Sequence, residues 1–182
     1  MSFHHVFETA FGFCGIVWSE RGVCRFMLPV DAPAPAEEEL TKRRSASSAA
    51  TPSGEIAKTV AAVVRYFEGE REDFAQTPVD LDGTPPFHQA IYRAARRLAY
   101  GETTTYGALA TEAGFPKSAQ ETGVALGRNP IPLIIPCHRI LAAGGKLGGF
   151  SAPGGTATKQ KMLGLEGAIS PDAHPDQASF AF

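Results

Sequence analysis

Residues Asn129–Ile140 read NPIPLIIPCHRI, and the interpretation of the whole chain depends on this stretch. Its apolar positions, 131 and 133–135, favour burial in a hydrophobic core. Its three prolines exclude a regular helix, because each lacks a backbone N–H and has a fixed φ. The apolar run ends at Cys137 and His138. A cysteine beside a histidine suits a thiolate nucleophile, because a neighbouring base or positive charge must lower the pKa of the thiol.

Cys137 has two possible interpretations on these residues alone. Free cysteines in apolar surroundings are mostly inert core residues. The order of the whole stretch, Asn-Pro-x-Pro-x-x-x-Pro-Cys-His-Arg-Ile, favours a reactive thiol instead, because it resembles the active-site signature of the O6-alkylguanine-DNA alkyltransferases. The resemblance extends from about residue 87 to residue 167, and more weakly over the N-terminal part.

The resemblance implies that an alkyl group moves from O6 of guanine in DNA to the sulfur of Cys137, with O4-alkylthymine as a second candidate substrate. It implies that His138 acts as a base through a bridging water, that Glu166 orients His138, and that Tyr106 protonates the departing guanine. Asn129 is expected to hold the turn around the cysteine. No cofactor is implied, and each molecule is expected to act once, because nothing in the sequence could reverse the thioether.

The resemblance also implies a pocket for a nucleotide flipped out of the duplex. Ser151 would contact guanine O6, the carbonyls of Cys137 and Ile140 would accept from the exocyclic amine, and Pro132 would form one wall. Residues 147–155 are rich in glycine and proline, so that this loop can lie close to a flat ligand. Its further candidates for substrate binding are Gly148, Gly149 and Phe150.

Two short helices, over residues 105–113 and 117–126, are predicted on either side of a Gly-Phe-Pro turn. Plain helical domains contain such pairs, but the resemblance implies a helix-turn-helix whose second helix enters the minor groove of DNA. The candidate DNA-binding residues are Tyr106, Ser118, Ala119, Gln120, Gly123 and Arg128. The family usually carries an arginine where this chain has Gln120, and the acidic Glu121 follows, so we expect weaker DNA binding than in a typical relative.

The net charge of −2 hides an asymmetry along the chain. Residues 1–82 contain 8 basic and 13 acidic side chains, whereas residues 83–168 contain 9 basic and 4 acidic ones. A basic C-terminal half suits double-stranded DNA as a partner, although ordinary charge scatter between two domains is the alternative.

The three cysteines are an odd number without CxxC spacing, which favours free thiols in a reducing cytoplasm. No apolar run approaches the length of a transmembrane helix, and the N-terminus lacks the features of a secretory signal. We expect a cytoplasmic monomer without membrane association or a metal ion. Cys14 and Cys24, with His4 and His5 nearby, leave a zinc site as an alternative that their spacing does not support.

The first 82 residues are expected to form an α/β domain, for which the resemblance implies a ribonuclease-H-like arrangement. Residues 3–30 are rich in aromatic and β-branched residues and predict an antiparallel meander. Residues 31–53 are rich in alanine, proline, serine and charge, which predicts a flexible surface excursion. Ser53 is the candidate cap of a helix over 55–67, and residues 74–81 predict one more short strand.

The domain boundary is expected at residues 82–83, before a run of glycine and proline. Residues 83–168 predict a mostly helical domain with the DNA-binding and active-site residues, and residues 169–182 predict a disordered tail. Its helices are predicted at 87–100, 105–113, 117–126 and 156–165. The predicted fold class is therefore α+β, an N-terminal antiparallel sheet with a helix followed by a helical domain containing a helix-turn-helix.

Two other functions are weighed against alkyl transfer. A non-catalytic lesion-binding protein would resemble those relatives that replace the cysteine, and the presence of Cys137 argues against it. A cysteine hydrolase could use Cys137 and His138, but adjacent nucleophile and base are rare in that class and no oxyanion signature is present.

Overall fold

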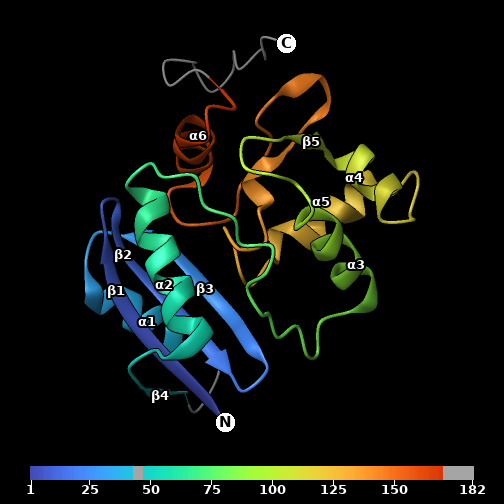
Figure 1. Ribbon diagram of the computed structural model, residues 1–182. Coiled ribbons are helices and arrows are strands. Elements are labelled where there is room, and N and C mark those ends of the chain that lie inside the picture. The colour runs from blue at the N-terminus through green and yellow to red at the C-terminus, as the bar shows by residue number, and fades with distance from the viewer. Residues whose placement is uncertain (43–46, 170–182) are drawn as a thin grey trace. The chain divides into compact units, whose positions relative to one another are not determined.

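The computed structural model describes residues 1–42 and 47–169, and the chain divides into two compact units (Figure 1). The first unit comprises Met1–Asp82 together with Pro130–Ile134, and the second comprises Gly83–Asn129 and the chain from residue 135 onward. The apolar stretch that precedes the cysteine therefore belongs to the N-terminal unit, where the Phe26 N–H donates to the Pro130 carbonyl at 2.9 Å. Residues 43–46 of the predicted excursion and the expected tail beyond Ile169 lie outside the described residues.

A four-stranded sheet forms the frame of the first unit, in the order β3-β2-β1-β4. The three long strands pair antiparallel, which confirms the predicted meander. The short fourth strand pairs parallel to β1, so the sheet is mixed, and the prediction of a purely antiparallel sheet is wrong at this edge. The strands are β1 (Ser2–Thr9), β2 (Gly12–Ser19), β3 (Gly22–Val30) and β4 (Ser47–Ala49).

Helices α1 (Pro33–Lys42) and α2 (Gly54–Phe67) cover opposite sides of this sheet (Figure 1). Helix α1 replaces the flexible excursion that the composition of residues 31–53 predicts. Pro33 suits a first helical position, and Ala36 and Leu40 lie one turn apart and are buried in the core.

Of the two remaining predictions for the first unit, the helix is confirmed and the strand is wrong. The predicted helix α2 is confirmed, with Ser53 at its N-cap position, but the Ser53 side chain makes no capping hydrogen bond. The strand predicted over residues 74–81 is wrong, because only Val79 forms an isolated bridge, to Val23.

The second unit is mostly helical, with a core that includes the fully buried Ile91, Leu109 and Ala125. A two-residue parallel pairing joins β5 to β6. Its elements are α3 (Pro86–Ala95), β5 (Thr104–Thr105), α4 (Tyr106–Glu112), α5 (Ala119–Gly127), the 3-10 turn η1 (Cys137–Arg139), β6 (Ile140–Leu141), the 3-10 turn η2 (Ala143–Gly145) and α6 (Gly155–Leu165). The fold is therefore mixed α+β.

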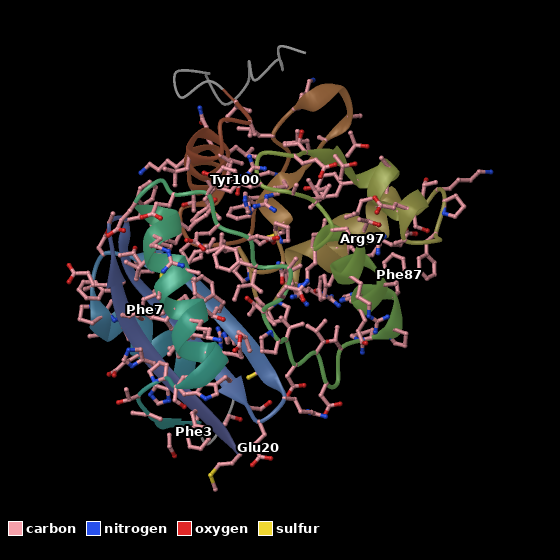
Figure 2. The ribbon with its side chains drawn as sticks, in the orientation of Figure 1. Phe3, Phe7, Glu20, Phe87, Arg97 and Tyr100 are labelled. Carbon is pink, nitrogen blue, oxygen red and sulfur yellow. The ribbon has the colours of Figure 1, made fainter. Side chains whose placement is uncertain are left out.

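Helix α3 ends at Ala95 rather than continuing to Tyr100 as predicted. The residues beyond the helix form two other hydrogen bonds instead, one local and one to a distant part of the chain. The Ala99 N–H donates to the Glu102 carboxylate at 2.8 Å. The hydroxyl of Tyr100, the residue labelled in Figure 2, donates to the Leu165 carbonyl at 2.9 Å. The sequence signal extended past the helix because residues 98–100, Leu-Ala-Tyr, remain apolar or aromatic after the helix stops.

No helix within the described ranges is both long enough and apolar enough to cross a bilayer.

Candidate active site

Cys137 opens the 3-10 turn η1, immediately after Pro136. Its side chain is largely buried, and its N–H donates to the Ile135 carbonyl at 2.8 Å. The same carbonyl accepts from Nδ2 of Asn129 at 2.9 Å, so this side chain fixes the backbone that leads into the cysteine. Burial raises the pKa of the Cys137 thiol, while the Asn129 side chain and the Lys159 ammonium act against that rise.

The two residues that follow Cys137, His138 and Arg139, belong to a buried hydrogen-bonded group with Glu166. Nε2 of His138 lies 2.7 Å from Oε1 of Glu166, and Glu166 is the C-cap residue of α6. The guanidinium of Arg139 donates to both carboxylate oxygens, from Nε at 2.8 Å and from Nη2 at 3.0 Å. Its third contact is the Leu98 carbonyl, 2.7 Å from Nη1. In the sequence, Arg139 stood out only as one position of the conspicuous stretch 129–140. In the structure, it balances the charge of Glu166.

These contacts set the protonation of both partners. Burial alone would raise the pKa of Glu166, but the hydrogen bond from His138 and the Arg139 guanidinium hold that pKa well below its usual range. Burial lowers the pKa of His138, although Glu166 opposes this shift. His138 is therefore neutral and Glu166 ionised near neutral pH.

The tautomer of His138 follows from this pairing. An ionised carboxylate only accepts, so the proton of the neutral ring is assigned to Nε2. Nδ1 is then left with a free lone pair, and among the described residues this buried atom has no hydrogen-bond partner. The arrangement provides a neutral imidazole that can accept a proton at Nδ1.

Lys159, on α6, is a buried polar residue of this unit that the sequence analysis missed. Its Nζ donates to the Ile140 carbonyl at 2.6 Å and lies 5.9 Å from the centroid of the Tyr106 ring. Burial lowers the pKa of Lys159 to about 8, and Cys137 acts in the opposite direction. A signal was present, because Lys159 precedes the buried Met162 and Leu163 by three and four residues and so shares their helix face.

Tyr106 begins α4, and Thr105 caps that helix by accepting from the Ala108 N–H at 3.2 Å. Burial raises the pKa of the Tyr106 phenol, with a second contribution from Cys137. Gly148 lies against the ring at a φ of +70°, where an added Cβ would lie 3.4 Å from the phenol oxygen.

The other residues predicted to bind the substrate lie in different places. Ser151 lies beside the end of α5, because a Cβ on Gly127 would come within 3.3 Å of its Oγ. Among the described residues, no atom lies within 4 Å of the position of a Cβ added to Gly149, and Phe150 is half-buried. Pro132 lies in the segment that packs with the N-terminal unit.

The candidate DNA-binding residues lie on and around α5. Ala119, Gln120 and Arg128 are exposed, while Ser118 and Gly123 are half-buried. Ser118 occupies the N-cap position of α5 without a side-chain capping hydrogen bond. Glu121, in the first turn of this helix, is an exposed acidic residue.

No group of three histidine, cysteine or acidic side chains in residues 1–42 and 47–169 is arranged to hold a metal ion. Cys14 and Cys24 are buried in the sheet, and the Cys24 thiol donates to the Val17 carbonyl at 3.4 Å.

Known proteins similar to this chain agree with the fold of both units. The family model of the 6-O-methylguanine DNA methyltransferase DNA-binding domain matches residues 86–168. The methylated-DNA–protein-cysteine methyltransferase of Haemophilus influenzae is 48% identical over 102 residues, which cover 56% of this chain and 55% of that protein. The corresponding Mycobacterium leprae protein is 41% identical over 114 residues, or 63% of this chain and 67% of that protein. The alignments thus span roughly half to two thirds of these curated relatives.

Solved structures extend the similarity over nearly the whole chain. A variant of the Mycobacterium tuberculosis O6-methylguanine methyltransferase is 30% identical with a TM-score of 0.74, covering 91% of this chain and 93% of that one. The structure of the M. tuberculosis protein in complex with DNA is 29% identical with a TM-score of 0.74, covering 90% and 91%. The chain belongs to the 6-O-methylguanine DNA methyltransferase family.

Proposed function

We propose that this protein repairs DNA by transferring the alkyl group of O6-alkylguanine to the sulfur of Cys137, once per molecule. The single observation that carries the proposal is the placement of His138, adjacent in sequence to Cys137, with its Nε2 bound to Glu166 and its buried Nδ1 without a partner among the described residues. The family to which the chain belongs supports the choice of substrate.

The first chemical step is ionisation of the thiol. The Cys137 proton passes to Nδ1 of His138, through a water if the two atoms are not in direct contact, and leaves a thiolate. The Glu166 carboxylate stabilises the resulting imidazolium through the 2.7 Å hydrogen bond to Nε2. Arg139 keeps Glu166 ionised, so the residue is ready to do this at neutral pH.

The second step is displacement at carbon. A sulfur–carbon bond forms as the carbon–O6 bond breaks, and the bonding electron pair stays on guanine. Tyr106 donates its phenol proton to the departing base, and the proton held by His138 then restores the phenol. The product is a thioether, which no group of the site can cleave, so the protein is consumed in the reaction.

The target base must leave the duplex before the sulfur can reach it. We assign DNA binding to a helix-turn-helix formed by α4 and α5, with exposed Gln120 and Arg128 on the second helix facing the duplex. The M. tuberculosis relative solved in complex with DNA supports DNA as the partner, and we propose that the DNA is double-stranded. Ser151 and the carbonyl of Ile140 would recognise the guanine. We further propose that the protein works as a monomer in the cytoplasm.

The test is to incubate the protein with a duplex containing one O6-methylguanine and to measure its intact mass. We expect a gain of one methylene unit, located on the peptide with Cys137 and absent in Cys137→Ser. Stable binding to the lesion without a mass change would instead identify a damage sensor. Repeated turnover of an ester substrate would identify a hydrolase.

A further inference from the structure

Lys159 is a buried cation that the transfer described above does not use. Its side chain has no exposed surface. Within residues 1–42 and 47–169, no carboxylate pairs with its ammonium, whose hydrogen bond goes to the Ile140 carbonyl at 2.6 Å. An unpaired buried ammonium is strongly unfavourable, because burial removes its hydration without a compensating anion. The residue therefore needs either neutralisation or an anion close by.

The neighbouring ionisable groups leave one candidate for that anion. Glu166 already pairs with Arg139 and His138 on η1. Tyr92 on α3 and Tyr106 on α4 are phenols whose pKa values are raised by burial, so both stay neutral. Cys137 remains, three residues before the carbonyl that anchors the ammonium.

The buried charges support the same conclusion. With a neutral His138 and a protonated Cys137, Arg139 and Glu166 cancel, and Lys159 leaves the group one positive charge in excess. A thiolate at Cys137 removes this excess. Because opposite charges in a poorly solvated site attract strongly, the ammonium makes ionisation of the thiol easier.

We propose that Lys159 is a positioning residue of the transfer, whose ammonium is held by the Ile140 carbonyl as the counter-ion of the Cys137 thiolate. The inference rests on the proposed function for its biological meaning, but the ion pair itself can be tested without DNA. When the sulfur becomes a neutral thioether, the ammonium loses its partner. By linkage, the coupling that favours the thiolate must equally favour the protonated lysine.

The first experiment measures the rate at which iodoacetamide modifies Cys137 as a function of pH, followed by peptide mass. In Lys159→Met we expect a higher apparent pKa of the thiol and a rate about tenfold lower at neutral pH, which corresponds to a shift of about one pKa unit. Lys161→Met is the matched control, because it removes an exposed lysine from the same helix and should leave the profile unchanged. Thermal unfolding establishes that both variants are folded.

A pH profile of folded Lys159→Met identical to that of the wild-type protein would overturn the inference. Lys159→Arg keeps the charge and should recover part of the rate where the longer side chain is accommodated. The outcome also separates this inference from the proposed function. A shifted thiol profile in a protein that leaves O6-methylguanine untouched supports the ion pair and rejects the repair activity.

The second experiment needs no variant and therefore does not depend on folding of a mutant. The Lys159 amine is titrated by NMR of protein labelled at lysine 13Cε, before and after Cys137 is blocked with iodoacetamide. We expect the titration midpoint of Lys159 to fall on blocking, by about as much as the thiol pKa rises in Lys159→Met. A midpoint that does not move contradicts the ion pair.

Discussion

Nε2 of His138 lies 2.7 Å from Oε1 of Glu166, and both side chains are fully buried in the second unit. The two residues are 28 positions apart, so only the tertiary fold brings them together. Arg139 binds the same carboxylate, which makes Glu166 the anion shared by a base and a fixed cation. Stability and reactivity of this unit are therefore linked through one side chain.

Replacing Glu166 should destabilise the protein more than replacing one residue of an exposed ion pair. Glu166→Gln leaves the buried Arg139 without a counter-charge, and we expect the free energy of unfolding to fall by about 3–5 kcal/mol. Glu112→Gln is the matched control, because its ion pair with Arg97 is about half exposed and should contribute at most about 1 kcal/mol. Urea unfolding followed by circular dichroism measures both values. Equal losses in the two variants would contradict the shared-anion interpretation.

Stability should fall as the pH is lowered from neutral. The folded-state pKa of His138 is depressed by burial, so the unfolded chain binds a proton first, below about pH 6.5. The pKa of Glu166 is also depressed, and its contribution is lost at still lower pH, below the ordinary value of about 4.3. Both groups therefore contribute full stability above about pH 7. The measurement is the free energy of unfolding in urea from pH 8 to pH 4.

The pKa of His88 is also lowered, by burial and by Arg128. The contributions of His88 and His138 to the pH dependence of stability must therefore be measured separately. His88→Asn should keep most of the slope between pH 7 and pH 5, whereas His138→Asn should reduce it. A wild-type stability that stays constant over this range would show that neither histidine is held neutral.

How far the sequence predicted this site depends on the kind of contact. The Thr105 cap and the helix ending at Phe67 were predictable, because caps and helix periodicity are local signals. Lys159 was missed because a lysine on a helix is normally solvated, although its spacing to Met162 placed it on the buried face. The His138–Glu166 pair came from the family resemblance and not from spacing, since no local rule joins residues 28 positions apart.

The fold shows the same division between local and tertiary information. Helix α1 was missed because the alanine- and proline-rich composition of its segment is also typical of flexible chain. Leu40 distinguishes the two, because its side chain fills the space above Gly15 of the sheet, where an added Cβ would lie 2.6 Å from it. That complementarity exists only after the sheet has formed. The parallel strand β4 depends in the same way on where the helix returns the chain.

Gly148 should be needed for the position of Tyr106. Gly148→Ala introduces a Cβ 3.4 Å from the phenol oxygen at a φ of +70°, so we expect slower alkyl transfer as well as a loss of about 1 kcal/mol of stability. Gly144→Ala is the matched control, because Gly144 has nearly the same backbone, at a φ of +74°, but no atom of the part of the chain that the structure describes lies within 4 Å of the added Cβ. Single-turnover rates with an O6-methylguanine duplex should fall only for Gly148→Ala. Equal rates in the two variants would show that Gly148 is not needed for the position of Tyr106.

Gln120 should limit DNA affinity. Gln120→Arg places a positive charge on the exposed start of α5, and we expect tighter duplex binding with a steeper salt dependence, by about one unit in the slope of log K against log salt. Gln120→Met is the control for side-chain size and should not steepen the slope. The iodoacetamide reactivity of Cys137 should be the same in both variants. Fluorescence anisotropy at several salt concentrations gives the slopes, and an unchanged slope for Gln120→Arg would place this residue away from the phosphates.

In the proposed reaction, the sulfur of Cys137 accepts one alkyl group and cannot react again. The most direct measurement is the number of methyl groups removed per protein molecule in a large excess of O6-methylguanine duplex, followed to completion. We predict a plateau at one group per molecule, all of it on Cys137, and no transfer by Cys137→Ser. Repair that continues beyond one equivalent, or that persists in Cys137→Ser, would contradict the account.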